Sequence, residues 1–149
     1  MGITIGVVRV VLIISLLGGI CGCALTPPTA DGVRAMDPER QIVFIAPENY
    51  QPVYRKILDE ARRCYQFGVM SVQGMVQGDI FQETRSGRIT HTMVGGFGNQ
   101  TFEVIDVVAI DNNQTRVVGH YVHATESASK YHAEALKKWV LDNTPMCER

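Results

Sequence analysis

The stretch TFEVIDVVAIDNNQTRVVGHYV, residues 101–122, decides the fold of this chain. Apolar and polar residues alternate through both of its halves, and Asp111-Asn112-Asn113 stands between them. A period of two indicates β-strands, and a short segment of Asn and Asp indicates a tight turn. The stretch therefore predicts an antiparallel hairpin formed by residues 101–110 and 114–122.

The same period continues upstream, so the hairpin belongs to a larger antiparallel sheet. Turn residues divide this region at Gln77-Gly78, at Ser86-Gly87 and in the loop 95–98. The segments between them predict strands at residues 67–76, 79–83 and 88–94, and the apolar run QIVFIA predicts another at 41–46. Short strands joined by tight turns predict a β-meander of about four to five strands.

A helix is predicted on each side of the meander. Asn49 is a natural N-cap, Pro52 suits the first turn, and apolar residues recur at helical spacing as far as Tyr65. A second helix is predicted from Thr125 or Ser127 to just before residue 143, with Trp139 in its buried stripe. The pattern predicts an α+β fold in which the N-terminal and C-terminal helices pack on one face of the sheet.

The first 22 residues have the composition of a secretory signal. Arg9 is their only charge, an apolar run covers residues 10–17, and Gly18-Gly19 follows. So short an apolar run favours a cleaved signal peptide. The alternative is a retained anchor over residues 3–20, which would place Arg9 in the bilayer at a cost of roughly 2.5–3.5 kcal/mol.

The segment Ile20-Cys21-Gly22-Cys23 resembles the lipobox of bacterial lipoproteins. The resemblance implies that Cys23 is acylated and tethers the chain to a membrane of the cell envelope. It also indicates the outer membrane, because Ala24 stands where Asp would signal retention in the inner membrane. The alternative is ordinary signal cleavage after Ala24, which would release a soluble secreted domain.

The mature chain then divides into a tether and one domain. Residues 23–40 contain Pro27, Pro28, Gly32 and Pro38, and we expect a flexible tether after the lipidated cysteine. Residues 41–149 are expected to form a single α+β domain. Because the resemblance implies an oxidising compartment, the two remaining cysteines, Cys64 and Cys147, are expected to form a structural disulfide.

The sequence carries no recognisable catalytic, cofactor or metal signature, and we expect a protein that is not an enzyme. His120 and His123 would lie on opposite faces of a strand, which is unsuitable for a shared metal ion. Without the signal, 13 basic residues face 15 acidic ones, a net charge of about −2. No basic stripe with interleaved aromatic residues occurs, which argues against nucleic-acid binding.

The functional expectation is a structural or protein-interaction role in the envelope. Candidate contacts for an envelope protein are Phe97, held between glycines in a loop, and Asn112 and Asn113 at the hairpin tip. Alternatively, Phe97 folds back into the core. The second hypothesis for function is binding of a lipid or small apolar ligand in a pocket between helix and sheet. The oligomeric state is left open.

Overall fold

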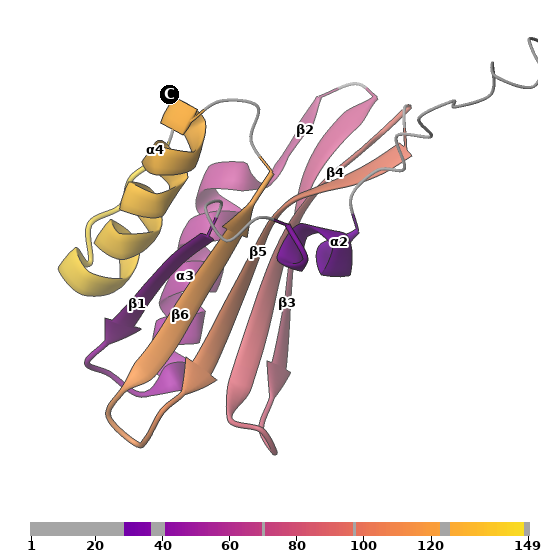
Figure 1. The fold of residues 1–149 in the computed structure, drawn as a ribbon. Coiled ribbons are helices and arrows are strands. Elements are labelled where there is room, and N and C mark those ends of the chain that lie inside the picture. Colours follow the sequence, from indigo (N-terminus) through magenta and orange to yellow (C-terminus); the bar gives the residue numbers. More distant parts are fainter. Residues whose placement is uncertain (1–28, 37–40, 70, 97, 123–125, 148–149) are drawn as a thin grey trace, which may run out of the picture.

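The computed structural model describes residues 29–36, 41–69, 71–96, 98–122 and 126–147, with the backbone alone for residues 126–129. Its elements in chain order are α2 (Ala30–Arg34), β1 (Gln41–Ala46), α3 (Tyr50–Tyr65), β2 (Phe67–Val69), β3 (Val72–Phe81), β4 (Ser86–Gly95), β5 (Gly98–Ala109), β6 (Thr115–Tyr121), α4 (Glu126–Lys137) and the π-helix η2 (Lys138–Asp142). The arrangement is shown in Figure 1.

The strands form one antiparallel sheet in the order β1-β6-β5-β4-β3-β2. The α+β class is therefore confirmed, but the sheet has six strands rather than four to five. The 101–122 hairpin forms as expected, with Ala109 opposite Thr115. The first strand of the chain, β1, adds to the outer side of β6, with Ala46 opposite Thr115.

The expected turns at Gln77-Gly78 and Ser86-Gly87 are wrong. Gln77 and Gly78 lie inside β3, and Ser86 and Gly87 begin β4. The chain turns instead through residues 82–85, where Arg85 adopts a positive φ of 50°. Both glycines are explained by packing, because a Cβ atom at either position would collide with the side chain of Tyr54.

Helix α3 forms where the apolar stripe predicted it. The side chain of Asn49 caps it by accepting a hydrogen bond of 3.0 Å from the backbone N–H of Gln51. Its buried residues include Val53, Tyr54 and Ile57, and the helix packs against β3, β4 and β5. These contacts place α3 over the middle of the sheet.

The C-terminal helix also contributes to the core. Leu136 of α4 and Trp139 of η2 are buried in the same hydrophobic cluster as Ile57 of α3 and Ile105 of β5. The expected core role of Trp139 is thus confirmed, and its indole Nε1 donates a 3.0 Å hydrogen bond to the carbonyl of Met146. The left-handed conformation of Asn143 ends the helix, in agreement with the predicted boundary.

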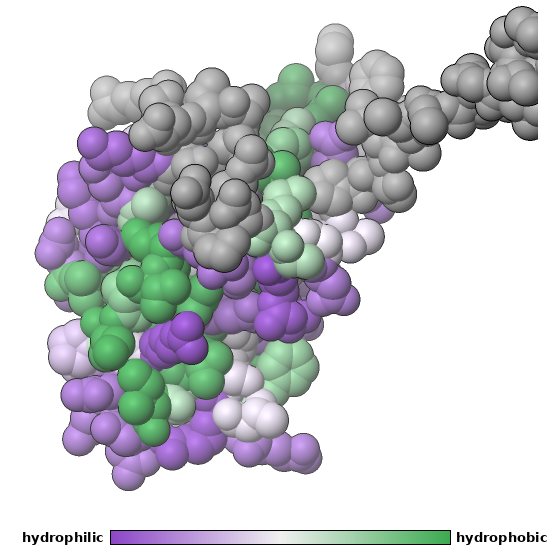
Figure 2. Space-filling view, viewed as in Figure 1, coloured by the Kyte–Doolittle hydropathy of each residue, from purple (hydrophilic) through white to green (hydrophobic). Residues whose placement is uncertain are grey.

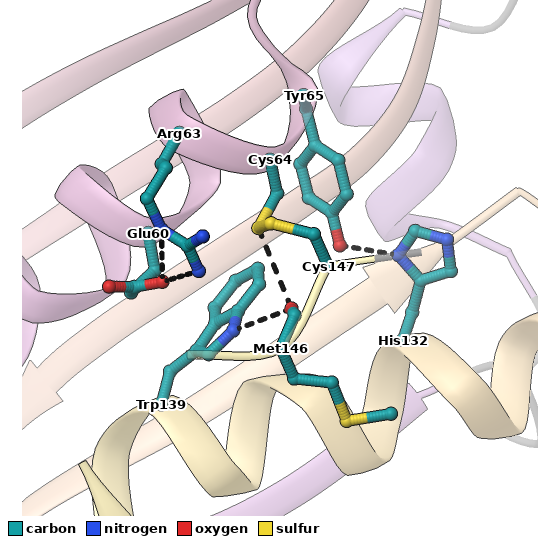
Figure 3. Close-up of a disulfide and its surroundings, with 8 residues drawn as sticks. All are labelled: Glu60, Arg63, Cys64, Tyr65, His132, Trp139, Met146 and Cys147. Carbon is teal, nitrogen blue, oxygen red and sulfur yellow. Dashed lines mark hydrogen bonds and ion pairs between the residues drawn. A yellow bond between two sulfur atoms is a disulfide. The ribbon is translucent and has the colours of Figure 1, made fainter. Parts of the chain in front are cut away.

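A disulfide fixes the C-terminal tail. Cys64, near the end of α3, bonds to Cys147, which lies 83 residues further along the chain (Figure 3). The predicted pairing is confirmed. The bond ties the tail to α3 beside Trp139, whose partner Met146 precedes Cys147.

One short helix packs against the sheet away from α3. Residues 30–34, which lie inside the segment expected to be a flexible tether, form α2, whose Val33 is buried. Helix α2 contacts β5 and β6, and the hydroxyl of Thr29 caps it by accepting from the backbone N–H of Gly32. No helix within the described ranges is long and apolar enough to cross a bilayer.

We expect removal of the disulfide to destabilise the domain strongly. The paired substitution Cys64→Ser with Cys147→Ser should lower the free energy of unfolding by on the order of 4 kcal/mol, because a long loop is no longer closed in the unfolded chain. Chemical denaturation of the oxidised protein and the double variant measures this difference. Equal stability of the two proteins would contradict a structural role for the bond.

Candidate functional site

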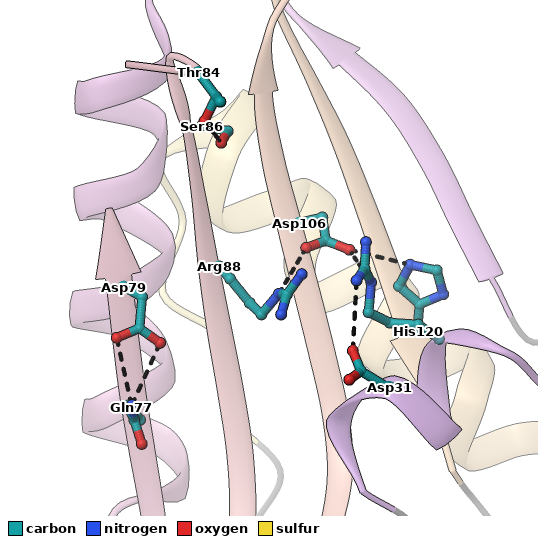
Figure 4. Close-up of polar contacts among 9 residues, drawn as sticks. Asp31, Gln77, Asp79, Thr84, Ser86, Arg88, Asp106 and His120 are labelled. Atoms are coloured by element: carbon teal, nitrogen blue, oxygen red, sulfur yellow. Dashed lines mark hydrogen bonds and ion pairs between the residues drawn. The ribbon is translucent and has the colours of Figure 1, made fainter. Parts of the chain in front are cut away.

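The two faces of the sheet differ in what covers them. Along β5, Ile105 and Val107 point into the core beneath the helices, while Asp106 and Val108 alternate with them on the opposite side. We call this opposite side the open face. Figure 4 shows α2 lying on it beside Asp106.

A cluster of charges around Asp106 holds α2 on the open face. The Asp106 carboxylate lies 2.8 Å from Arg34 Nε of α2, 3.2 Å from Arg88 Nε of β4 and 3.6 Å from His120 Nε2 of β6 (Figure 4). Burial lowers the pKa of His120 below its usual value, although the charge of Asp106 opposes that shift. Asp106 therefore makes its strongest pairs with the two arginines, one of which belongs to α2.

Large apolar side chains are exposed on the open face beyond α2. Val43 and Ile45 of β1 are 49 % and 56 % exposed, and Val108 of β5 is 41 % exposed. Ile45 and Val108 flank Arg116 in the register of the sheet. We call Val43, Ile45 and Val108, with Ile110 just after β5, the apolar patch; Figure 2 shows hydrophobic residues gathered over β1 and β6 on this side.

A shallow hollow of about 380 Å³ lies on the other side of α2. Its lining carries hydroxyl, amide and apolar groups but no charge, and consists of Thr29, Ala30, Met75, Gln77, Thr90, Thr92, Val94, Asn99 and Thr101. The open face thus offers two surfaces, an uncharged polar hollow and the apolar patch, with α2 between them.

Beneath the helices, the sheet buries a carboxyl group. Glu103 is 1 % exposed and stands between His91 of β4 and Tyr121 of β6 in the sheet register. Its carboxyl oxygens make no hydrogen bond with the described residues. Burial raises the pKa of Glu103 to about 8, so the acid is largely protonated at neutral pH.

Aromatic and histidine rings surround Glu103. The ring of Tyr65 stacks on His91 with centroids 4.7 Å apart, and its hydroxyl makes a 2.8 Å hydrogen bond with His132 Nδ1 of α4 (Figure 3). Burial, and then the neighbouring Glu103, raises the pKa of Tyr121. In this conformation Glu103 is too deeply buried to contact a dissolved substrate, so the cluster acts as a polar part of the core.

The residues predicted to contact a partner are placed as follows. Cys23 and Phe97 lie outside the described residues. Asn112 and Asn113 are exposed at the β5–β6 turn, as expected. Asn112 also forms hydrogen bonds with residues outside this turn. Its carbonyl accepts a 3.1 Å hydrogen bond from Asn49, and its side-chain oxygen accepts one of 2.9 Å from Arg85.

Sequence reasoning missed both Asp106 and Glu103. In the sequence, the odd spacing of Asp106 and Asp111 argues against a carboxylate pair, and nothing in the pattern indicates that Asp106 meets Arg34 of the expected tether. Glu103 lies two residues before Ile105 on β5, so its side chain points to the same core face as those of Ile105 and Val107. An acid at such a position is the signal that could have identified a buried carboxyl group.

Comparison with protein-family models, curated proteins and solved structures finds no match to this chain. Among the described residues, no group of three or more His, Cys, Asp or Glu side chains is arranged to hold a metal ion. The functional argument therefore rests on the surfaces of the chain itself.

We expect Glu103 to make the domain less stable as pH rises. Above its ordinary pKa of 4.5 the carboxyl loses its proton in the unfolded chain, whereas the folded protein retains it up to about pH 8. The linked loss of stability across this window is on the order of 5 kcal/mol. Denaturation from pH 5 to 8 should show a falling stability in the native chain and a much flatter profile in Glu103→Gln. Parallel profiles would contradict a buried neutral acid.

Asp106→Ala should release α2 from the open face. The substitution leaves Arg34 and Arg88 without their shared carboxylate, at a cost of about 1–3 kcal/mol. Trypsin should then cut after Arg34 faster than in the native chain, as followed by mass spectrometry. Asp31→Ala is the matched control, because Asp31 is exposed and lies 3.7 Å from the same arginine. Equal cleavage rates in the two variants would argue against the clamp.

Proposed function

We propose that this protein is a lipoprotein of the bacterial outer membrane, anchored through Cys23, whose domain binds another envelope component without catalysing a reaction. In this proposal, α3 and α4 cover one face of the sheet, and the open face meets the partner. The anchor is supported by the lipobox resemblance of Ile20-Cys21-Gly22-Cys23. The binding role is supported by the apolar patch.

The exposure of the apolar patch is the observation that carries the binding role. Val43, Ile45 and Val108 are large β-branched residues that each leave two fifths or more of their surface in solvent. Val43 and Ile45 lie on β1 and Val108 lies on β5, and all three are on the open face, where Arg116 of β6 stands between Ile45 and Val108. Exposed apolar side chains that gather on one face among polar residues are typical of a site that associates with another molecule.

The length of the anchor segment supports a partner close to the membrane. Six residue steps separate Cys23 from Thr29, which caps α2 on the open face. A chain of that length spans at most about 20 Å. Lipidation at Cys23 would therefore hold Thr29, at the start of α2, within that distance of the bilayer surface.

The alternative role, binding of an apolar ligand between helix and sheet, has less support. At Gly78 and Gly87 the side chain of Tyr54 already lies too close to the sheet for even a methyl group to fit between them. The described part of the helix–sheet interface is filled there by the protein's own side chains. This packing favours a partner that binds outside the core.

The anchor is tested by Cys23→Ser in cells. We expect the variant to lose the mass of the acyl groups and to leave the membrane fraction, because a single substitution removes the acylation site. Mass spectrometry and membrane fractionation measure both effects. A variant that keeps its mass and its location would refute lipidation at Cys23.

The binding face is tested in the same cells by a photo-crosslinking amino acid at Val108. We expect a specific adduct with an envelope component from this position and none from Arg55, an exposed position on α3. Adducts of equal yield at both positions, or at Arg55 alone, would exclude the open face as the binding surface.

A further inference from the structure

Strand β1 lies at the edge of the sheet without the usual protection of an edge strand. Its sequence, QIVFIA, contains no charge, proline or glycine. All six residues pair with β6 in one continuous register, without a bulge. Natural edge strands are commonly blunted by a lysine, a proline, a bulge or short length, because a regular free edge is a template for another strand.

The other edge of the sheet is less regular. Strand β2 has only three residues, one of which is Gly68, and it pairs only with Val72–Gly74 of β3. The rest of β3 forms the edge from there on, and it contains Gly78 and the charged Asp79. The side chains of β2 are just as exposed, since Val69 reaches 62 %. Within the described part of the chain, β6 is the strand that pairs with β1, and no strand pairs with the outer side of β1. The two edges therefore differ in regularity and charge rather than in apolar exposure.

We propose that β1 pairs antiparallel with β1 of a second copy of this chain, so that two six-stranded sheets join into one sheet of twelve strands. The dimer does not depend on Cys23 or on what the open face binds. Its two-fold axis runs perpendicular to the sheet, which keeps the helices of both copies on the same side. Side chains that face each other across the new strand pair must then belong to the same face.

This condition restricts the register. Two residues directly opposite each other must both have odd numbers or both have even numbers. The two-fold axis therefore passes through one residue of β1, not between two residues. Centring it on Phe44 pairs Val43 with Ile45 of the second copy, and Ile45 with its Val43. Two exposed β-branched pairs would thereby form on the open face. On the helix face the two Phe44 side chains would meet, and each is now only partly buried against its own core.

A second copy fits this edge better than a strand from a different protein for two reasons. Self-pairing brings no charge against the uncharged edge, and it matches β-branched residues with β-branched residues. It is also closed, because pairing of the two β1 strands leaves no free β1 edge to which a third copy could add. Pairing of β1 with the β2 edge of the next copy would instead continue into an open fibre.

Native mass spectrometry and light scattering of the full-length chain in detergent test the dimer. We expect a dimer whose dissociation constant rises by roughly tenfold or more in Ile45→Lys, because two lysines would enter the new strand pair. Ile45 is largely exposed, so the substitution spares the core. Val69→Lys on β2 is the matched control and should leave the dissociation constant within about twofold. A native chain that remains monomeric at every concentration, or a dimer lost in Val69→Lys but not in Ile45→Lys, would overturn the proposal.

Cysteine pairing tests the register without disturbing the core. A mixture of Val43→Cys and Ile45→Cys chains should yield a disulfide-linked heterodimer on oxidation, identified by its linked peptides, because directly opposite residues lie at disulfide distance. Neither variant alone should link efficiently through its new cysteine. Efficient linking of Val43→Cys alone would move the axis to residue 43, and a linked protein other than this chain would reject self-pairing.

Discussion

The close approach of α3 to the sheet is the constraint on which the rest of the structure depends. The Tyr54 side chain lies against Gly78 of β3 and Gly87 of β4, and a Cβ atom at either position would push the helix outward. The distance between α3 and the sheet determines how deeply Ile57 is buried and where Cys64 lies at the end of the helix. Through Cys64, it also fixes the C-terminal tail that carries Cys147.

Two acids on one strand show how a period of two separates different environments. Glu103 and Asp106 are three residues apart on β5 and therefore lie on opposite faces. Asp106 meets two arginines and His120 beside α2, and its contact with Arg34 clamps α2 to the sheet. Glu103 meets rings beneath the helices, where burial favours its neutral form. Strand β5 thus carries the ion pairs that hold α2 on one face and a neutral buried acid on the other.

Local patterns in the sequence are sufficient for the 101–122 hairpin and both long helices, because each depends on neighbouring residues. The disulfide was expected from the two cysteines that remain in the oxidising compartment implied by the lipobox resemblance. The glycines at positions 78 and 87 are not turn glycines, and the sequence alone does not show this, since a glycine needed for close packing looks the same as one needed for chain reversal. Helix α2 was missed because its stability comes from Arg34 meeting Asp106, a contact between segments far apart in sequence. The open face could not be predicted for the same reason: exposure of Ile45 depends on which strands and helices surround it.

The arrangement leaves one corner of the sheet where exposed backbone and exposed side chains coincide. Helix α2 covers the sheet near Asp106 and His120, whereas Ile45 and Val108 share the next row toward the β5–β6 turn. Because Arg34 is held by Asp106, α2 cannot slide over that row without losing its ion pair. A longer helix would cover the patch, and a shorter β1 would remove the regular edge. The short helix and the full-length edge strand together make this corner the part of the fold best suited to meet another chain.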